Sequence, residues 1–196
     1  MESIFPFLEH DTLAQALAML GFAKAICDAG EGDQCWADAI SGWGFRFNFL
    51  RLNNQNNMPE FYVASSFTTR MAVVAIRGFC AFNFMDFSAE PVYVQLLDGT
   101  SGGCTQGYVN LEVLLKALWL KAQLGSTLME LENRGYDVYM TGVSFGGAIA
   151  TMLALLLKFD LPTLQCITFG APPVRASLNT RLPCLPRNLL RTVVYW

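Results

Sequence analysis

Ser144 is the residue whose neighbours most strongly indicate chemistry. It lies between Gly142 and Gly146 in the pattern G-x-S-x-G. The preceding residues, 136–141, have the apolar character of a strand, and the residues from Phe145 to about 159 that of a helix rich in small side chains. Such a sharp strand-to-helix turn projects the serine as a nucleophile for acyl transfer, and glycines flank it because a Cβ would clash with the backbone. The alternative is a tight turn without chemistry.

The helix after Ser144 also places hydrogen-bond donors where acyl transfer needs them. A helix N-terminus carries backbone N–H groups and the positive end of the helix dipole, and both stabilise a developing oxyanion. The backbone N–H of Phe145 is therefore a candidate oxyanion donor. Gly147 joins Gly142 and Gly146 as the third glycine of the turn.

A nucleophilic serine needs a base to take its proton and an acid to orient that base. The only carboxylate after Ser144 is Asp160, and the only histidine is His10. About fifteen helical residues at roughly 1.5 Å each place Asp160 more than ~20 Å from the serine, so it cannot be the acid. His10 precedes the first predicted helix, in the wrong order for this fold, and we interpret it as a surface residue near a helix cap.

Composition limits the class of protein. The chain has 196 residues, of which 53% are hydrophobic and 15% charged, as expected for one globular domain over residues 1–196. The net charge of −3 and the pI of about 5.1 argue against nucleic acid as a partner. No apolar run reaches the roughly 18 residues of a transmembrane helix, and the N-terminus lacks the pattern of a signal peptide, which favours a cytoplasmic location.

The cysteines and the single histidine bear on metals and redox state. Six cysteines occur without any C-x-x-C pair, so we expect no zinc or other metal site and no cofactor. An even count permits disulfides, but the scattered spacing is equally consistent with buried thiols. Cys166 lies in an apolar stretch and is predicted to be core.

Strands and helices alternate along the chain. Apolar residues spaced three and four apart from Leu13 to Cys27 predict a first helix that ends near Gly30. The continuously apolar residues 71–76 predict a strand buried on both faces. Further strands are predicted at 92–97, 164–169 and 190–196. A long helix is predicted at 109–131, with an apolar side formed by Leu111, Leu114, Leu115, Leu118 and Ala122. This alternation predicts an α/β fold with a mostly parallel sheet and flanking helices.

Five segments, in this order along the chain, resemble motifs of the class 3 lipases, the fungal triacylglycerol-lipase-like family of α/β-hydrolases. They are Ala75–Phe79, similar to Phe-Arg-Gly-Ser/Thr; Asn83-Phe84 with Asp86, similar to Asn-Trp-x-x-x-Asp; Gly107-Tyr108, similar to His-x-Gly-Phe; Gly142–Gly147, similar to Gly-His-Ser-Leu-Gly-Gly; and Thr168–Val174, similar to Thr-Phe-Gly-x-Pro-Arg-Val. The likeness covers roughly residues 60–196. It implies a lipid ester as substrate and the backbone N–H of Phe79 as a second oxyanion donor.

The resemblance also assigns a role to the apolar segment after Phe79. By analogy with the family this segment is a lid, a helix that covers the nucleophile in water and turns its apolar face to a lipid–water interface. The candidate lid residues are Phe82, Phe84, Met85 and Phe87. The alternative is that these side chains are ordinary core.

The chain departs from the family pattern at several positions. Val143 and Thr105 stand where the family has histidines, Pro173 where it has arginine, and Phe79 where it has a hydroxyl residue. The spacing from Asn83 to Asp86 is one residue shorter than in the family. Since the backbone N–H of Phe79 can still donate, losing the assisting hydroxyl costs at most the ~2.7–4 kcal/mol of a whole oxyanion donor.

The last residues resemble the family strand that leads to the acid of the triad. Residues 191–196 align with Arg-Val-Val-Asn-x-x-Asp, which puts the acid at position 197 and the histidine some tens of residues later. We therefore expect an α/β-hydrolase domain whose C-terminal part is missing. The 196-residue chain alone is then expected to have almost no turnover and to aggregate.

Three functions are consistent with these residues. The first is hydrolysis of lipid esters, with acylglycerols as the expected substrates, through an acyl-enzyme on Ser144 in the full-length parent. The second is a catalytically inactive lipase-like protein that binds lipid or a partner, as Val143, Thr105 and Phe79 would suggest. The third is a serine-dependent acyl transferase on the same fold. The sequence does not decide the oligomeric state.

Overall fold

The computed structural model describes residues 10–29, 35–52, 58–78, 93–96, 107–172, 175–176 and 190–193. Its helices are α1 (His10–Ala29), α2 (Cys35–Gly42), α3 (Leu111–Asn133) and α4 (Phe145–Leu157). Its strands are β1 (Arg46–Arg51), β2 (Phe61–Ser66), β3 (Met71–Ile76), β4 (Tyr93–Leu96), β5 (Gly107–Asn110), β6 (Asp137–Val143), β7 (Gln165–Phe169), β8 (Arg175–Ala176) and β9 (Leu190–Val193).

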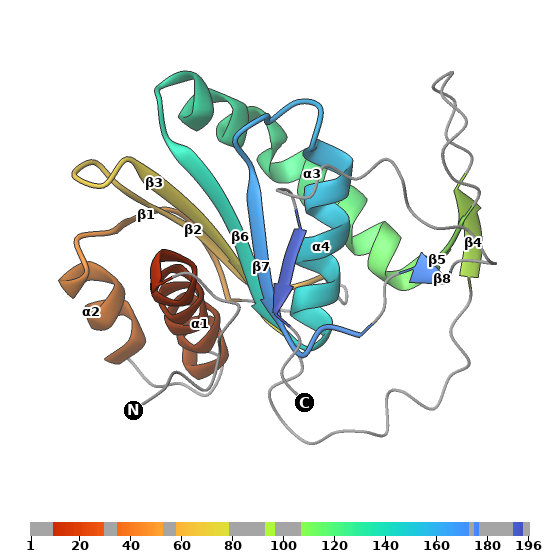
Figure 1. Ribbon diagram of the computed structural model, residues 1–196, viewed down its shortest axis with the longest axis horizontal. Coiled ribbons are helices and arrows are strands. Elements are labelled where there is room, and N and C mark those ends of the chain that lie inside the picture. Colours follow the sequence, from red (N-terminus) through yellow and green to blue (C-terminus); the bar gives the residue numbers. More distant parts are fainter. Residues whose placement is uncertain are drawn as a thin grey trace.

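The described strands form two sheets. The larger has the order β1-β2-β3-β6-β7-β9; its β1–β2 and β2–β3 pairs are antiparallel, and the pairs from β3 to β9 are parallel. The smaller sheet, β4-β5-β8, is antiparallel. Helices cover both faces of the large sheet, with α1 and α2 on one side and α3 and α4 on the other (Figure 1). The predicted α/β fold with flanking helices and mostly parallel strands is confirmed.

The two faces of β6 contribute to two separate hydrophobic cores. Val138 and Met140 pack with α3 and α4, whereas Tyr139 packs with α1 and α2 on the opposite face. This alternation follows from the period of two along a strand. The register pairs Ile76 of β3 with Gly142 of β6, and Gly142 with Thr168 of β7. The carboxyl ends of three parallel strands therefore meet at one edge of the sheet.

Helix α4 fills the space between the sheet and α3. Its sequence, FGGAIATMLALLL, is apolar around the whole helix, which is typical of a helix without a solvent-facing side. Nearly all of its residues are buried. The small residues of its first turn allow a close approach to the strands, and this packing sets the position of the turn that precedes it.

Helix α1 is tied to the sheet by buried hydroxyl groups. The hydroxyl of Thr141 donates to the carbonyl oxygen of Met19 at 3.2 Å, and the Gln15 amide donates to the Tyr139 hydroxyl at 2.8 Å. The Tyr62 hydroxyl on β2 donates to the carbonyl of Phe22 at 2.8 Å. Since Gln15 lies beside Tyr139 and Met19 beside Thr141, α1 runs in the same direction as β6.

The structure corrects the predicted boundary and face of the long helix. Val109 belongs to β5, and α3 begins at Leu111 because the Asn110 side chain caps it by accepting the N–H of Val113 at 3.1 Å. Leu115 and Leu118 are 54% and 44% exposed, so they are not core. The buried stripe comprises Val113, Leu114, Ala117, Leu120, Leu124, Leu128 and Leu131, so of the predicted apolar side Leu114 is core.

Other predicted elements agree in position with the structure. The first helix, the strand at 71–76 and the strand at 164–169 correspond to α1, β3 and β7, and the elbow helix ends slightly early, at Leu157. The last strand is described over Leu190–Val193, and residues 194–196 lie outside the described part. Cys166 is buried as predicted, and Cys27 is disulfide-bonded. Within the described residues no helix combines the length and apolar character needed to cross a membrane.

Candidate active site

Ser144 occupies the turn between β6 and α4 in a strained backbone conformation. Its φ is 52° and its ψ −125°, and among the described non-glycine residues only Arg70 shares a positive φ. The turn is fixed on both sides: the N–H of Ser144 donates to the carbonyl of Phe169 at 2.9 Å, and its own carbonyl accepts the N–H of Ala148 at 3.1 Å. Such a conformation costs of order 1–3 kcal/mol and persists only where the surrounding structure imposes it.

The glycines around Ser144 are required by contacts between backbone atoms. A Cβ on Gly142 would lie 2.6 Å from the carbonyl carbon of Gly146, and a Cβ on Gly146 would lie 2.3 Å from the carbonyl oxygen of Ile76. A Cβ on Gly147 would lie 3.0 Å from that of Ala171 and from the carbonyl oxygen of Gly142. At Gly142 and Gly146 a Cβ would therefore lie well inside van der Waals contact with backbone atoms, as predicted from the sequence.

A fourth glycine, Gly78, belongs to the same contact. It follows β3, and a Cβ there would lie 2.1 Å from the carbonyl oxygen of Val143 and 3.0 Å from the backbone nitrogen of Gly146. The segment after β3 thus touches the elbow directly, backbone against backbone. Its motif was noted in the sequence, but the contact depends on β3 lying beside β6, which the motif alone does not show.

The predicted oxyanion donors lie on the two segments that meet at this contact. Phe145 is the first residue of α4, with its side chain buried, and its N–H belongs to the helix N-terminus. Phe79 directly follows Gly78 but lies outside the described residues. The candidate lid residues also lie outside the described part: Phe82, Phe84, Met85 and Phe87.

A buried lysine near the elbow was not predicted from the sequence. Lys116 on α3 is only 7% exposed, and its Nζ lies 5.9 Å from the centre of the Phe145 ring. The same Nζ forms an ion pair with Glu112 at 2.9 Å. A lysine in a helix usually indicates the solvent side, so only the packing of α3 on α4 identifies this one as part of the surroundings of Phe145.

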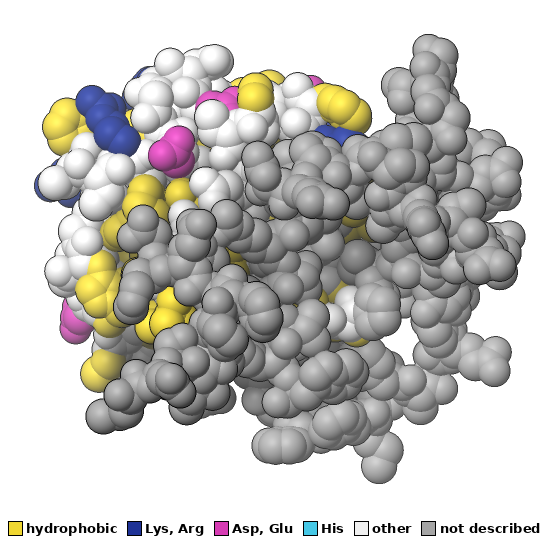
Figure 2. All heavy atoms as spheres, in the orientation of Figure 1, with side chains coloured by type: hydrophobic (Ala, Val, Ile, Leu, Met, Phe, Trp, Pro, Cys, Tyr) yellow, Lys and Arg dark blue, Asp and Glu magenta, His cyan; other side chains and the backbone are white. Residues whose placement is uncertain are grey.

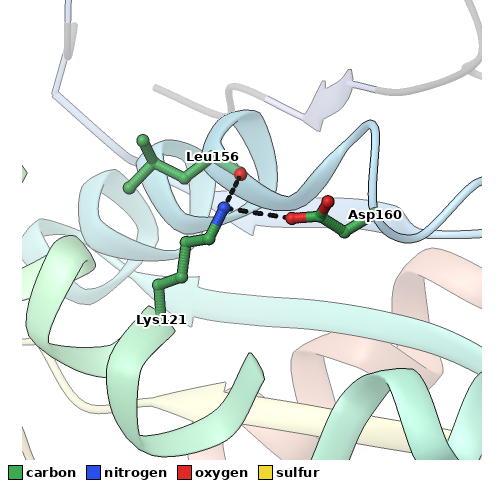
Figure 3. Close-up of polar contacts among 3 residues, drawn as sticks. All are labelled: Lys121, Leu156 and Asp160. Atoms are coloured by element: carbon green, nitrogen blue, oxygen red, sulfur yellow. Dashed lines mark hydrogen bonds and ion pairs between the residues drawn. The ribbon is translucent and has the colours of Figure 1, made fainter. Parts of the chain in front are cut away.

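Asp160 is held away from Ser144 at the opposite end of α4. The Nζ of Lys121, from α3, lies 3.0 Å from a carboxylate oxygen of Asp160 and donates to the carbonyl oxygen of Leu156 at 2.7 Å (Figure 3). The lysine thereby closes the C-terminal end of α4, where carbonyl groups lack helical partners. This arrangement agrees with the expectation that Asp160 is not the acid of a triad.

His10 also lies away from the candidate nucleophile. It is the first residue of α1, which runs in the same direction as β6. The start of α1 is therefore near the amino end of β6, whereas Ser144 follows the carboxyl end. Among the described residues there is no group of three or more His, Cys, Asp or Glu side chains that could hold a metal ion.

The charged side chains of the described residues do not form a single cluster on the face that Figure 2 shows. Figure 2 shows Lys, Arg, Asp and Glu side chains set apart from one another among hydrophobic and uncharged ones, mostly toward one edge of the view. The described ion pairs include Lys24 with Asp28 and Arg134 with Glu130, both between helical neighbours. Exposed pairs of this kind contribute little to stability.

A serine at positive φ between a central parallel strand and a buried helix, with glycines packed against neighbouring backbone, has the strand–turn–helix geometry found in α/β-hydrolase folds. The family described as Lipase (class 3) matches residues 73–192, more than half of the chain. The chain belongs to the class 3 lipase family.

Solved structures of fungal lipases share this fold. A lipase from Rhizopus microsporus var. chinensis has a TM-score of 0.67 at 16% identity, over 86% of this chain and 60% of that one. The triacylglyceride lipase of Rhizomucor miehei has a TM-score of 0.66 at 18% identity, over 86% and 65%. The Lip2 lipase of Yarrowia lipolytica has a TM-score of 0.67 at 16% identity, over 84% and 61%. The chain thus spans about 60–65% of the length of these lipases. No curated protein matches the sequence.

Proposed function

We propose that the complete protein hydrolyses carboxylic esters of lipids, with acylglycerols as the substrate class and Ser144 as the nucleophile. The observation that carries this proposal is the backbone of Ser144, at φ 52° and ψ −125°, imposed by glycines that touch neighbouring backbone. Membership of the class 3 lipase family supports the same reaction class.

The proposed reaction is that of a serine hydrolase. The Oγ of Ser144 attacks the ester carbonyl, and a base takes the Oγ proton and passes it to the departing alcohol. The backbone N–H groups of Phe145 and Phe79 stabilise the oxyanion of the tetrahedral intermediate. Water then attacks the acyl-enzyme by the same steps and releases the fatty acid.

We place the base and its acid in the part of the related lipases' length that this chain does not span. Within the described residues His10 and Asp160 lie away from the elbow, and both positions support this assignment. The candidate lid, with Phe82, Phe84, Met85 and Phe87, would bring the site to a lipid–water interface.

A second candidate is a catalytically inactive lipase-like protein that binds lipid or a partner protein. One observation favours it: the half-buried Val143 stands directly before Ser144, where the family has histidine. Under this alternative the elbow would persist without turnover. The strain at Ser144 argues for the enzyme, since a binding protein gains nothing from holding a serine at positive φ.

The two candidates are separated by assaying the complete protein, made from its full transcript, on emulsified triacylglycerol and on a short-chain ester. We expect fatty acid release that Ser144→Ala abolishes, and residual or no turnover by the 196-residue chain alone. Absence of Ser144-dependent release by the complete protein would favour the binding protein. Strong Ser144-dependent turnover by the 196-residue chain would overturn the placement of the base.

A further inference from the structure

Lys116 is a buried charged side chain that the proposed reaction does not use. It lies in the second turn of α3, and its side chain is 9% exposed. Its Nζ is 5.9 Å from the centre of the Phe145 ring, within the range of a cation–π interaction. Phe145 is itself buried and is the first residue of α4, directly after Ser144. A positive charge is therefore enclosed beside the residue that follows the nucleophile.

This position is electrostatically unfavourable as long as no negative charge is present. The N-terminus of α4 is the positive end of the helix dipole, and cations are stabilising at the opposite end of a helix. Burying an ammonium also costs free energy, so a lysine is seldom buried unless it is paired. The neighbouring buried residues of α3 are apolar, among them Val113, Ala117 and Leu120. Packing alone therefore does not explain a lysine at position 116.

Glu112 compensates the charge of Lys116 from the solvent side. Its Oε1 lies 2.9 Å from the Nζ, but the Glu112 side chain is 53% exposed whereas that of Lys116 is 9% exposed. Water screens the carboxylate more strongly than the ammonium, because the effective dielectric constant is higher at the surface than in the interior. The ammonium is also the member of the pair that lies against the Phe145 ring. Towards α4 the positive charge is therefore the dominant one.

We propose that Lys116 stabilises the oxyanion of the hydrolysis through its electric field, acting together with the N-terminus of α4. The inference rests on the proposed function, in which the N–H of Phe145 donates to that oxyanion. The nitrogen of a phenylalanine lies no more than about 5 Å from the centre of its ring, so the Nζ of Lys116 is within about 11 Å of the Phe145 nitrogen. The described contacts of Lys116 are with Glu112 and the Phe145 ring, so it acts at a distance and is not a catalytic residue.

Coulomb's law gives the expected size of this effect. At about 11 Å and an effective dielectric constant of about 20, the attraction between two unit charges is equivalent to roughly a tenfold change in rate. Partial compensation by Glu112 reduces this to about 3- to 10-fold. The ester substrate is uncharged and the negative charge develops only in the transition state, so kcat should change and KM should not.

The test compares Lys116→Met, Lys116→Arg and Glu112→Gln in the complete protein, with kcat and KM measured on a soluble short-chain ester. We expect Lys116→Met to lower kcat about 3- to 10-fold, and Lys116→Arg, which keeps the charge, to stay within about twofold of wild type. Glu112→Gln removes the opposing charge, so it should leave kcat unchanged or raise it by up to about threefold. A role in structure alone would instead make the loss of either partner lower kcat.

Lys121→Met is the matched control. Lys121 is on the same helix, but its Nζ pairs with Asp160 and donates to the carbonyl of Leu156 at the opposite end of α4. A cation there is remote from Ser144, so Lys121→Met should keep kcat within about twofold of wild type, whatever its melting temperature.

The affinity of an alkylboronic acid separates the electric field from general damage. The boronate forms a negatively charged tetrahedral adduct on the serine, so its affinity should fall in Lys116→Met by the same factor as kcat. In Glu112→Gln that affinity should be unchanged or higher. If Lys116→Met does not fold, Lys116→Gln and Glu112→Gln carry the same test, since one removes the positive charge and the other the negative one.

The outcomes distinguish this inference from the proposed function. An active wild type whose folded Lys116→Met or Lys116→Gln variant keeps kcat and boronate affinity within twofold would overturn the role of Lys116 and leave the function intact. Similar losses of kcat in Lys116→Met, Lys116→Arg and Glu112→Gln would also overturn it, because the ion pair would then serve the structure and not the charge. A complete wild-type protein without Ser144-dependent hydrolysis would overturn both.

Discussion

Replacing Gly146 by alanine adds one methyl group where two backbone segments are already in contact. The new Cβ would lie 2.3 Å from the carbonyl oxygen of Ile76 and 2.6 Å from backbone atoms of Arg77 and Gly78. Favourable contacts between non-bonded heavy atoms lie near 3.5 Å, so the shortfall is about 1 Å on several atoms. No side-chain rotation can relieve it, because every obstacle is backbone of a segment held by the sheet.

The loss of stability caused by Gly146→Ala can be compared with that of adding a methylene group to a hydrophobic core. Inserting a methylene into a well-packed core costs about 1–3 kcal/mol, usually with side chains that can adjust. We therefore expect Gly146→Ala to reduce the free energy of unfolding by about 3 kcal/mol or more. Gly125, inside α3, is the matched control: no atom lies within 4 Å of a Cβ built there. Since alanine is the better helix former, Gly125→Ala should stabilise by about 0.5–1 kcal/mol.

The assay is urea unfolding of both variants and wild type in the complete protein, followed by tryptophan fluorescence; residues 1–196 contain four tryptophans. The same chemical change should shift the midpoint in opposite directions, with unchanged m-values. A Gly146→Ala variant within 1 kcal/mol of wild type would refute the reasoning, because it would show that the segment after β3 can move away from the elbow. A destabilised Gly125→Ala would refute the description of open space at α3.

Two further predictions concern Ser144 and Cys166. Ser144→Gly should stabilise the protein by about 1 kcal/mol: it relieves strain of about 1–3 kcal/mol, and the greater entropy of glycine in the unfolded chain offsets roughly 0.5–1 kcal/mol of that gain. Ser144→Ala keeps the Cβ and should not stabilise. Equal urea midpoints for the two variants would show that the turn is unstrained. Burial raises the pKa of the Cys166 thiol to about 12, from 9.0 when exposed. The contribution of the buried thiol to stability is therefore complete below pH 9. It is lost as the pH rises from 9 towards 12, by up to about 1.4 kcal/mol per pH unit, because the thiol ionises more easily in the unfolded chain. Cys166→Ala should therefore show a shallower loss of stability above pH 9 than wild type, and parallel curves would contradict the burial; Tyr62 and Tyr139, whose pKa values are also raised by burial, contribute alike to both proteins.

The elbow was predictable because its sequence pattern is local. The spacing of Gly142, Ser144 and Gly146 contains the whole steric requirement of the turn, and the apolar stretches before and after it indicate a strand and a helix. The structure has both, in β6 and α4. The continuous apolar run of β3 and the apolar surroundings of Cys166 are equally local signals, and both elements agree with their predictions.

The core face of α3 was not predictable because two of its stripes are apolar. Leu115 and Leu118 lie on one stripe, and Ala117 and Leu120 on another, at the same helical spacing. Only the packing against α4 and the sheet decides that the second stripe is buried. The buried position of Lys116 belongs to the same difficulty, since hydropathy alone assigns a lysine to the surface.

Elements at the first edge of the sheet carried weaker signals. The eight residues of α2 give only two turns of helical periodicity. Strand β1 combines the exposed Arg46 and the half-buried Arg51 with aromatic residues such as Phe49, whose ring stacks on that of Phe61 at 5.3 Å between centroids. The aromatic and apolar residues of β1 are compatible with either a strand or a loop. The contact of Gly78 with the elbow was the hardest feature to predict from the sequence. Gly78 and Gly146 are 68 positions apart in the chain, and they meet only because β3 lies beside β6 in the sheet.

The contact of Gly78 with Val143 and Gly146 has a consequence for how such sites diverge. Because backbone meets backbone there, the shape of the elbow makes few demands on the surrounding side chains beyond the absence of a Cβ. Side chains around the elbow can therefore change while the backbone keeps its conformation, in agreement with a shared fold at only 16–18% identity with three fungal lipases. Distant relatives of this protein should therefore be easier to recognise from the spacing of a few glycines along the chain than from overall sequence similarity.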